Sequence, residues 1–97
     1  MSKGYVVVHI EVTDPDTFEE YRGKVPATID QYGGRYLARG GTMETVEGAP
    51  LPPRTVLLEF PSVEQAKAWY DSPEYQAIIG LRLAASTGHA QIVEGVD

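Results

Sequence analysis

The feature that most constrains the fold is a pair of strand-like stretches that each lead directly into a helix-like stretch. In residues 4–12 the even positions from Val6 to Val12 are all apolar, and in residues 55–61 Val56, Leu58 and Phe60 form a second apolar row. Because successive side chains of a strand point to opposite faces, both rows predict strands with one face against a core. Each strand would therefore open a β–α unit.

Residues 13–32 predict the first helix. Asp14 is a suitable N-cap, and Pro15 occupies the first helical position, where its missing N–H costs nothing. Pro26 falls inside the helix and predicts a kink or a break, so we expect two helical segments that share one face. That face is an apolar stripe with a spacing of three or four residues: Phe18, Tyr21, Val25, Ile29 and Tyr32.

A second helical region follows the 55–61 strand. A Ser-x-x-Gln capping box begins at Ser62, and a new segment starts with Ser72 as N-cap and Pro73 in the first position. We expect Gly88 to end this segment and residues 89–96 to form the last strand.

The stretch "YGGRYLARGG" at residues 32–41 combines two glycine pairs with two arginines. A phosphate-binding loop places its glycines between a strand and the start of a helix, whereas here they lie between a helix and a strand. We therefore interpret the stretch as a helix end, a short strand over residues 35–39 and a loosened strand end. Residues 42–54 carry three prolines and predict a hairpin extension or a flexible loop.

The resulting β-α-β-β-α-β order predicts an α+β fold of the ferredoxin-like type, as one domain over residues 1–97. Such a fold has a four-stranded antiparallel sheet with the helices on one face. We expect the first and third strands to be central, in the order 4-1-3-2, because these two have the strongest apolar rows.

Composition excludes several classes of partner. The net charge is −6, with 14 acidic against 8 basic residues, so neither nucleic acid nor an anionic membrane surface is an expected partner. No apolar run approaches the length of a membrane span, and the N-terminal stretch lacks the features of a signal peptide. Cysteine is absent, which excludes disulfides and thiolate sites and fits the cytoplasm, where we expect the protein.

The sheet face away from the helices is expected to mix apolar and charged residues. Arg35, Leu37 and Arg39 would share one face of their strand. Such a surface can pair with a second copy, bind RNA or remain in water; we favour a homodimer, because the RNA interpretation lacks stacking aromatics and a basic surround. The other residues expected on this face are Tyr5, Val7, His9, Glu11, Leu57, Glu59, His89, Gln91 and Val93.

Motifs over nearly the whole chain resemble the domain-of-unknown-function family 1330, of the dimeric α+β barrel superfamily. They are "VTDPDTFEEY", "YGGRYLARGG", the "VEG" before the proline-rich loop, "RTVLLEFPSVEQAKAWYDSPEYQ" and the closing "IVEGV". The resemblance implies a ferredoxin-like protomer, a homodimer with facing sheets and a small cavity by the sheet. It implies no single reaction, since the superfamily includes cofactor-independent monooxygenases, isomerases, haem proteins and ligand sensors.

The family pattern extends to specific residues of this chain. Three departures stand out: Phe18 replaces a usual tyrosine, Leu51 replaces a frequent aromatic residue, and His9 occupies a position that is not fixed. The matching positions are Arg39, Gly40, Gly41, Arg54, Glu59, Trp69, Tyr70, Ser72, Tyr75 and Arg82.

Arg39 and Glu59 are expected on neighbouring strands and on the same face. In one interpretation Arg39 binds a carboxylate or enolate oxygen while Glu59 accepts a proton. In the other, which we favour, the two form a cross-strand ion pair that sets the register.

His9 and His89 should also be neighbours, on the first and fourth strands. They could act in acid–base catalysis or bind a metal with Glu11 or Glu59, but hydrogen-bonded histidines at a polar rim are the simpler interpretation. With no third histidine and no cysteine, we expect no metal site, and the small size of the chain argues against haem. We expect no cofactor.

The second helical region supplies the remaining candidates. Tyr75 is a candidate to place its hydroxyl in the cavity and transfer protons. Arg82 is a candidate ligand-binding residue, and without a ligand it must find a carboxylate, such as Glu59, or a carbonyl. Ser72 is a candidate ligand-binding residue but is most simply an N-cap. Trp69 and Tyr70 are expected in the core.

Three functions remain open. The first is a cofactor-independent enzyme that acts on a small anionic or carbonyl compound, with Arg39 holding the anion and Glu59, His9 or Tyr75 moving protons. The second is a dimer that binds a small ligand without chemistry. The third is a purely structural dimer.

Overall fold

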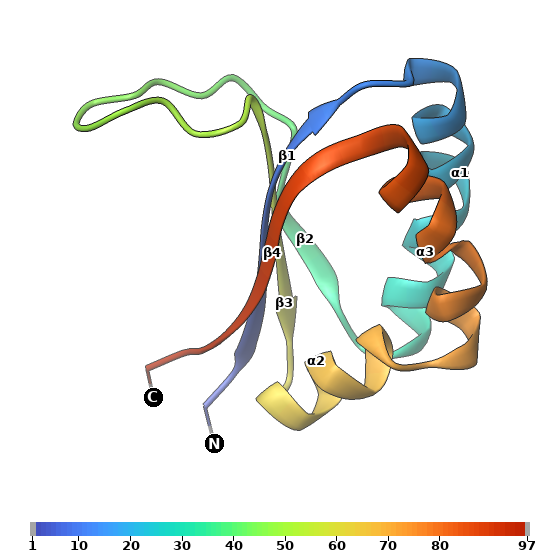
Figure 1. Ribbon diagram of the computed structural model, residues 1–97. Helices are drawn as coiled ribbons and strands as arrows, with labels where there is room; N and C mark the ends of the chain where they lie inside the picture. Colours follow the sequence, from blue (N-terminus) through green and yellow to red (C-terminus); the bar gives the residue numbers. More distant parts are fainter. Residues whose placement is uncertain (1, 97) are drawn as a thin grey trace.

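The computed structural model describes residues 2–96 and contains one four-stranded sheet with three helices on one side (Figure 1). All strand pairs are antiparallel, in the order β2-β3-β1-β4, which confirms the predicted ferredoxin-like topology with β1 and β3 at the centre. The elements are β1 (Gly4–Val12), α1 (Pro15–Gln31), β2 (Arg35–Arg39), β3 (Arg54–Phe60), α2 (Val63–Tyr70), α3 (Pro73–Ala85) and β4 (Ser86–Glu94).

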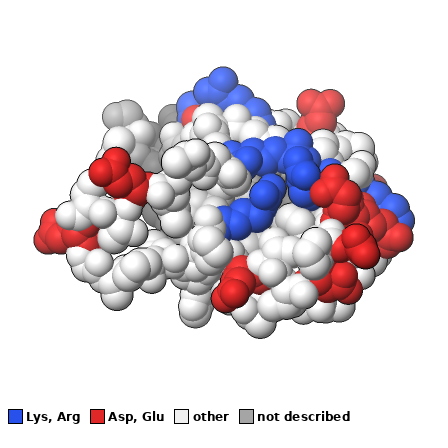
Figure 2. All heavy atoms as spheres, turned by 90° about the horizontal axis from the view of Figure 1, so that it is seen from above, with Lys and Arg blue, Asp and Glu red and all other residues white. Residues whose placement is uncertain are grey.

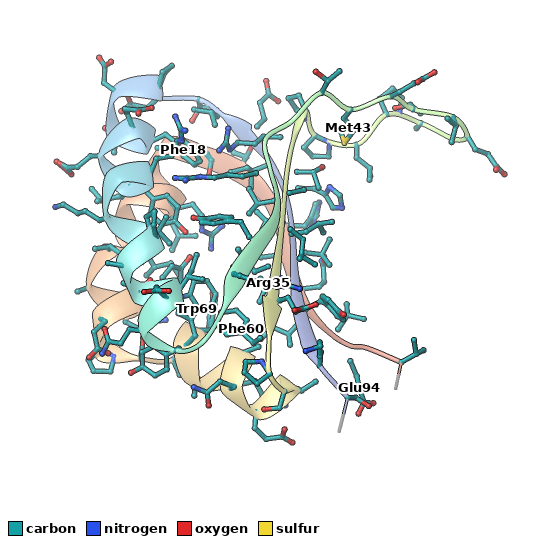
Figure 3. The ribbon with its side chains drawn as sticks, turned by 180° about the vertical axis from the view of Figure 1, so that it is seen from behind. Phe18, Arg35, Met43, Phe60, Trp69 and Glu94 are labelled. Carbon is teal, nitrogen blue, oxygen red and sulfur yellow. The ribbon has the colours of Figure 1, made fainter. Side chains whose placement is uncertain are left out.

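The core lies between the sheet and the helices. The apolar rows of β1 and β3 face the helices as predicted: Ile10 is 1% exposed and Phe60 is fully buried. Phe60 packs against Trp69 with ring centroids 5.4 Å apart. Figure 3 shows these two rings near one end of the space between helices and sheet, and Phe18 near the other. The core therefore follows from the two strand patterns on which the fold prediction rests.

Helix α1 is a single helix with Pro26 inside it, so the prediction of two segments is wrong. Proline removes the N–H that would bond to the carbonyl of the residue four positions earlier, which is Arg22. Here Nη2 of Arg39 donates to that carbonyl at 3.1 Å and replaces the missing helical bond. Buried Val25 and Ile29 hold the helix against the core on either side of the proline.

The predicted helix starts are confirmed. Asp14 accepts a hydrogen bond from the backbone N–H of Thr17, and Ser62 accepts one from that of Gln65. The side-chain amide of Gln65 bonds to the backbone oxygen of Tyr32 at 2.9 Å, which ties α2 to the end of α1.

Gly88 does not end a helix, contrary to the prediction. Helix α3 stops at Ala85, and β4 begins at Ser86, three residues before the predicted strand. Gly88 has φ +147° inside β4, and a Cβ there would collide with the backbone oxygen of His9. Glycine at this position therefore permits the close approach of β1 and β4.

A β-bulge interrupts β2. Arg35 lies opposite Glu59, but Arg39 lies opposite Val56, because the register shifts around Leu37. An extra residue in a strand exchanges the faces of the side chains that follow it. Arg35 therefore points away from the helices, whereas Arg39 points toward them.

The bulge corrects the prediction that Arg35, Leu37 and Arg39 share a face. Arg39 instead shares a side with Tyr36, and its guanidinium carbon lies 4.6 Å from the centroid of the Tyr36 ring.

The segment between β2 and β3 has neither helix nor strand from residue 40 to residue 53. It extends from the sheet on the side opposite the helices (Figure 1). Val46 and Leu51 are 88% and 55% exposed there. The hydroxyl of Thr55 donates to the sulfur of Met43 at 3.0 Å and so connects the base of this segment to β3.

Candidate functional site

A cavity lies between the sheet and the helices. Its volume is about 40 Å³, whereas a single water needs roughly 10–15 Å³. If the open space at its mouth is included, the volume free of protein atoms is about 550 Å³. Most of the lining is apolar or aromatic, from the residues Val6, Val8, Ile10, Phe18, Tyr21, Val25, Ile29, Tyr36, Val56, Leu58, Trp69, Tyr70, Tyr75 and Ala90.

The charged part of the lining is entirely basic. Within residues 2–96 no acidic residue or histidine is among the lining residues. Four of the five arginines of the chain line the cavity, namely Arg22, Arg39, Arg54 and Arg82. Figure 2 looks from above onto the end of the molecule at which Figure 3 labels Phe18, and basic side chains gather at the centre of this view. In a chain of net charge −6, this concentration of cations makes the cavity unusual.

Arg54 is held in place by a glycine and a phenylalanine. Its guanidinium carbon lies 5.1 Å from the centroid of the Phe18 ring. Gly40 has φ +68°, and a Cβ at this position would collide with Nη1 of Arg54. Gly40 therefore provides both the backbone turn after β2 and the space for the Arg54 side chain.

The arginines crowd one another. Burial, followed by the nearby charges of Arg22 and Arg39, lowers the pKa of Arg54 below its ordinary value. Nη1 of Arg22 donates to Glu19 at 3.0 Å on the exposed side of α1. The Nε atoms of Arg22 and Arg54 are buried, and neither has a hydrogen-bond partner in the part of the chain that the structure describes. A buried donor without a partner is destabilising, so an acceptor at this position would be favourable.

A second polar group lies on the α3 side of the cavity. The hydroxyls of Tyr21 and Tyr75 are 2.8 Å apart, and Nε of Arg82 donates to the Tyr75 hydroxyl at 3.3 Å. All three side chains are at most 8% exposed. Burial and the neighbouring Tyr75 raise the pKa of Tyr21, which keeps this phenol neutral.

This arrangement places Tyr75 in the cavity lining, as the sequence suggested. Arg82 also lines the cavity, but its expected carboxylate or carbonyl partner is wrong. Its hydrogen-bond partner is a phenol, and among the described residues no acidic side chain forms a salt bridge with it. A tyrosine hydroxyl both accepts and donates, so it can satisfy a guanidinium and still serve a second partner.

Ser72 is the N-cap of α3. Its hydroxyl accepts from the backbone N–H of Tyr75 at 3.1 Å and donates to the backbone oxygen of Trp69 at 2.7 Å. It is not among the residues that line the cavity. Of the two residues expected in the core, Trp69 is 2% exposed, while Tyr70 is only partly buried and lines the cavity.

Glu59 lies on the other face of the sheet, and its predicted pairing with Arg39 is wrong. Its carboxylate accepts from Nε of Arg35 at 2.9 Å and from the hydroxyl of Tyr5 at 3.3 Å. The hydrogen bond from Arg35 lowers the pKa of Glu59, and the charges of Arg35 and Lys3 act in the same direction. A lowered pKa fits an ion pair and not a general base that must take up protons near neutral pH.

His9 and His89 lie directly opposite each other on β1 and β4, as predicted. Nδ1 of His9 is 2.9 Å from the hydroxyl of Thr55, so this imidazole is hydrogen-bonded on the face away from the cavity. Within residues 2–96 no cluster of three or more histidine, cysteine, aspartate or glutamate side chains could hold a metal ion. Of the three candidates for proton transfer, only Tyr75 lines the cavity that Arg39 lines.

Sequence reasoning missed Arg22, Tyr21 and Tyr36 as cavity residues. The helical spacing places Tyr21 in the apolar stripe of α1, which is correct but does not identify it as a cavity residue. A usable signal for Arg22 was its position four residues before Pro26, where a free carbonyl attracts a donor.

The sequence pattern of the family described as "Domain of unknown function (DUF1330)" matches residues 3–96. The chain belongs to this family. No curated protein matches the DUF1330 chain. Within residues 2–96, none of its helices is both long and apolar enough to cross a membrane.

Several solved structures share the fold of this DUF1330 chain. A protein of unknown function from Rhodopseudomonas palustris has a TM-score of 0.73 at 12% identity, covering 96% of this chain and 80% of that one. A dimeric ferredoxin-like protein of unknown function from Jannaschia sp. has a TM-score of 0.68 at 16% identity, with 98% and 99% covered. SnoaB, a cofactor-independent oxygenase from Streptomyces nogalater, has a TM-score of 0.66 at 11% identity, with 100% and 96% covered. These similarities establish the fold.

Proposed function

We propose that this DUF1330 protein binds a small organic anion in the cavity between its sheet and its helices. One observation carries the proposal: four arginines, and none of the acidic residues that the structure describes, line the cavity. A carboxylate is the matching ligand group, because guanidinium N–H groups bind carboxylate oxygens in a planar arrangement. The apolar remainder of the lining suits a short hydrocarbon body.

The unpartnered Nε atoms of Arg22 and Arg54 strengthen this proposal. Each buried donor that lacks an acceptor costs about 1–3 kcal/mol, and a bound anion would recover part of that cost. The mutual repulsion of the arginines would fall at the same time, since an anion between them offsets their charges.

An enzymatic role is the second candidate. We propose that such an enzyme is cofactor-independent and acts on a small anionic or carbonyl compound, with Arg39 as anion holder and Tyr75 as proton donor. The hydrogen bond from Arg82 to Tyr75 supports this candidate, because it holds the phenol hydroxyl in a fixed position in the cavity. Glu59 and His9 are on the other sheet face and would not reach the same ligand. A non-catalytic binding protein or a purely structural dimer is the alternative.

We also infer that two copies form a homodimer through the sheet faces that lack helices. Leu37 and Val93 are each 47% exposed, and Val7 and Leu57 of the central strands lie on the same face. Similar proteins from Jannaschia sp. and Thermobifida fusca are described as dimeric.

We propose the cytoplasm as the location, and neither a membrane nor nucleic acid as a partner.

Native mass spectrometry of the purified protein tests the binding proposal. We expect a dimer that retains a small acid, and we expect Arg54→Met to lose the retained mass. Arg35→Met is the matched control, because Arg35 lies on the opposite sheet face. A ligand-free protein whose melting temperature no short carboxylic acid raises would refute the binding function.

A further inference from the structure

The two tyrosine hydroxyls of the cavity carry two protons, and only one of these protons takes part in a hydrogen bond. Tyr21 and Tyr75 each carry one O–H, and the hydrogen bond between them uses one of the two protons. Arg82 donates to Tyr75, so it consumes an acceptor and no proton. Whichever tyrosine donates to the other, the remaining O–H has no acceptor among the described residues. The pair therefore presents one buried donor.

The arginine side of the cavity also has hydrogen-bond donors without acceptors. The Nε–H groups of Arg22 and Arg54 have no acceptor among residues 2–96, and no carboxylate lines the space that they share. The unsatisfied groups of the cavity are therefore donors on both sides. A ligand that matches them must carry acceptors at two positions.

Both donor groups neighbour the Phe18 ring. The guanidinium carbon of Arg54 lies 5.1 Å from the centroid of the Phe18 ring, and the centroid of the Tyr21 ring lies 5.6 Å from it. Because both groups line the same cavity, one ligand of a few carbon atoms that lies against Phe18 would face both of them. The apolar lining between the two groups rules against a second charge in the middle of the ligand.

We propose that the cavity selects small oxo acids, with the carboxylate at the arginines and a carbonyl or enolate oxygen at the tyrosine pair. This inference rests on the proposed anion binding and adds the second oxygen. A neutral hydroxyl donor recognises a carbonyl oxygen, and a ligand without that oxygen leaves the donor unsatisfied.

Isothermal titration calorimetry with matched ligands tests the inference on the intact protein. Two pairs differ only in the oxo group: α-ketoisovalerate with isovalerate, and levulinate with valerate. We expect the oxo acid of at least one pair to bind about two- to tenfold more tightly than its parent acid. Equal affinity within both pairs would overturn the inference and leave the anion-binding function intact.

A neutral ligand separates the two proposals. Isopropyl methyl ketone has the carbonyl of α-ketoisovalerate but no carboxylate. If it binds as tightly as isovalerate, or if no acid binds at millimolar concentration, the anion-binding function fails and the inference fails with it.

Two single variants and their combination test whether the two tyrosines share one free O–H donor. Tyr21→Phe leaves Tyr75 with its own O–H, and Tyr75→Phe leaves Tyr21 with its own, so each single variant should keep the preference for the oxo acid. The double variant has no phenol proton and should lose the preference. A graded loss, with each single variant losing about half, would contradict the shared-donor arrangement. If the double variant does not fold, the comparison of ligand pairs on the natural protein still decides the question.

Discussion

Nη2 of Arg39 donates at 3.1 Å to the backbone oxygen of Arg22, the carbonyl that Pro26 leaves without its helical partner. This bond connects β2 to α1 beside the cavity. A proline that would ordinarily weaken a helix thus creates an acceptor that positions a cavity arginine.

A double-mutant cycle tests this relationship. Arg39→Met should lower the free energy of unfolding by about 1 kcal/mol, because the carbonyl loses its donor. Pro26→Ala restores a backbone N–H at this position, so Arg39→Met should cost much less in the Pro26→Ala background. Urea unfolding of the four proteins gives the coupling energy. Additive effects would show that the bond does not contribute to stability.

Alanine substitutions at the two adjacent glycines after β2, Gly40 and Gly41, should have different effects on stability and carboxylate binding. Gly40→Ala forces a side chain into the left-handed region and against Nη1 of Arg54, so we expect a loss of about 1–2 kcal/mol together with weaker carboxylate binding. Gly41→Ala is the matched control, since a Cβ at that position would have no heavy atom within 4 Å apart from those of its chain neighbours. Thermal unfolding and calorimetry with isovalerate measure both effects. Equal behaviour of the two variants would argue against a role for Gly40 in placing Arg54.

The ion pair of Glu59 and Arg35 should make stability depend on pH. The pKa of Glu59 is lowered in the folded protein, so the pair contributes stability above the ordinary value of 4.5. That contribution is lost as the pH falls through the folded-state pKa. The melting temperatures of the natural protein and Glu59→Gln should therefore differ at neutral pH and converge in acid. A difference that grows in acid would contradict the ion pair.

A charged substitution tests whether the sheet face without helices forms the dimer interface. Leu57→Arg places a cation at the centre of the proposed dimer interface, and we expect a monomer or an unfolded chain. Leu83→Arg is the control, because Leu83 is 61% exposed on α3. Sedimentation velocity reports the assembly state, and circular dichroism reports folding. A Leu57→Arg dimer as tight as that of the control would place the interface elsewhere.

Much of the fold was predictable because it depends on local rules. The apolar rows of β1 and β3, and the caps Asp14, Ser62 and Ser72, each identify an element by its own chemistry. The strand order followed from the strength of the two apolar rows.

The candidate site was less predictable because its residues depend on contacts between elements. Nothing in "RYLAR" marks Leu37 as the bulged residue, since no glycine or proline stands there. The sequence therefore paired Arg39 with Glu59, whereas Arg39 contacts α1. The partner of Arg82 was missed for a related reason: a tyrosine on its own helix serves where a carboxylate was expected.

The bulge in β2 also affects how relatives of this chain should be compared. One inserted residue moves a cation from one side of the sheet to the other without any substitution. Positions before Leu37 should therefore be counted from Gly34, and positions after it from Gly40. A relative that lacks one residue in this strand would retain the same arginine in its sequence and have an empty place for it in the cavity.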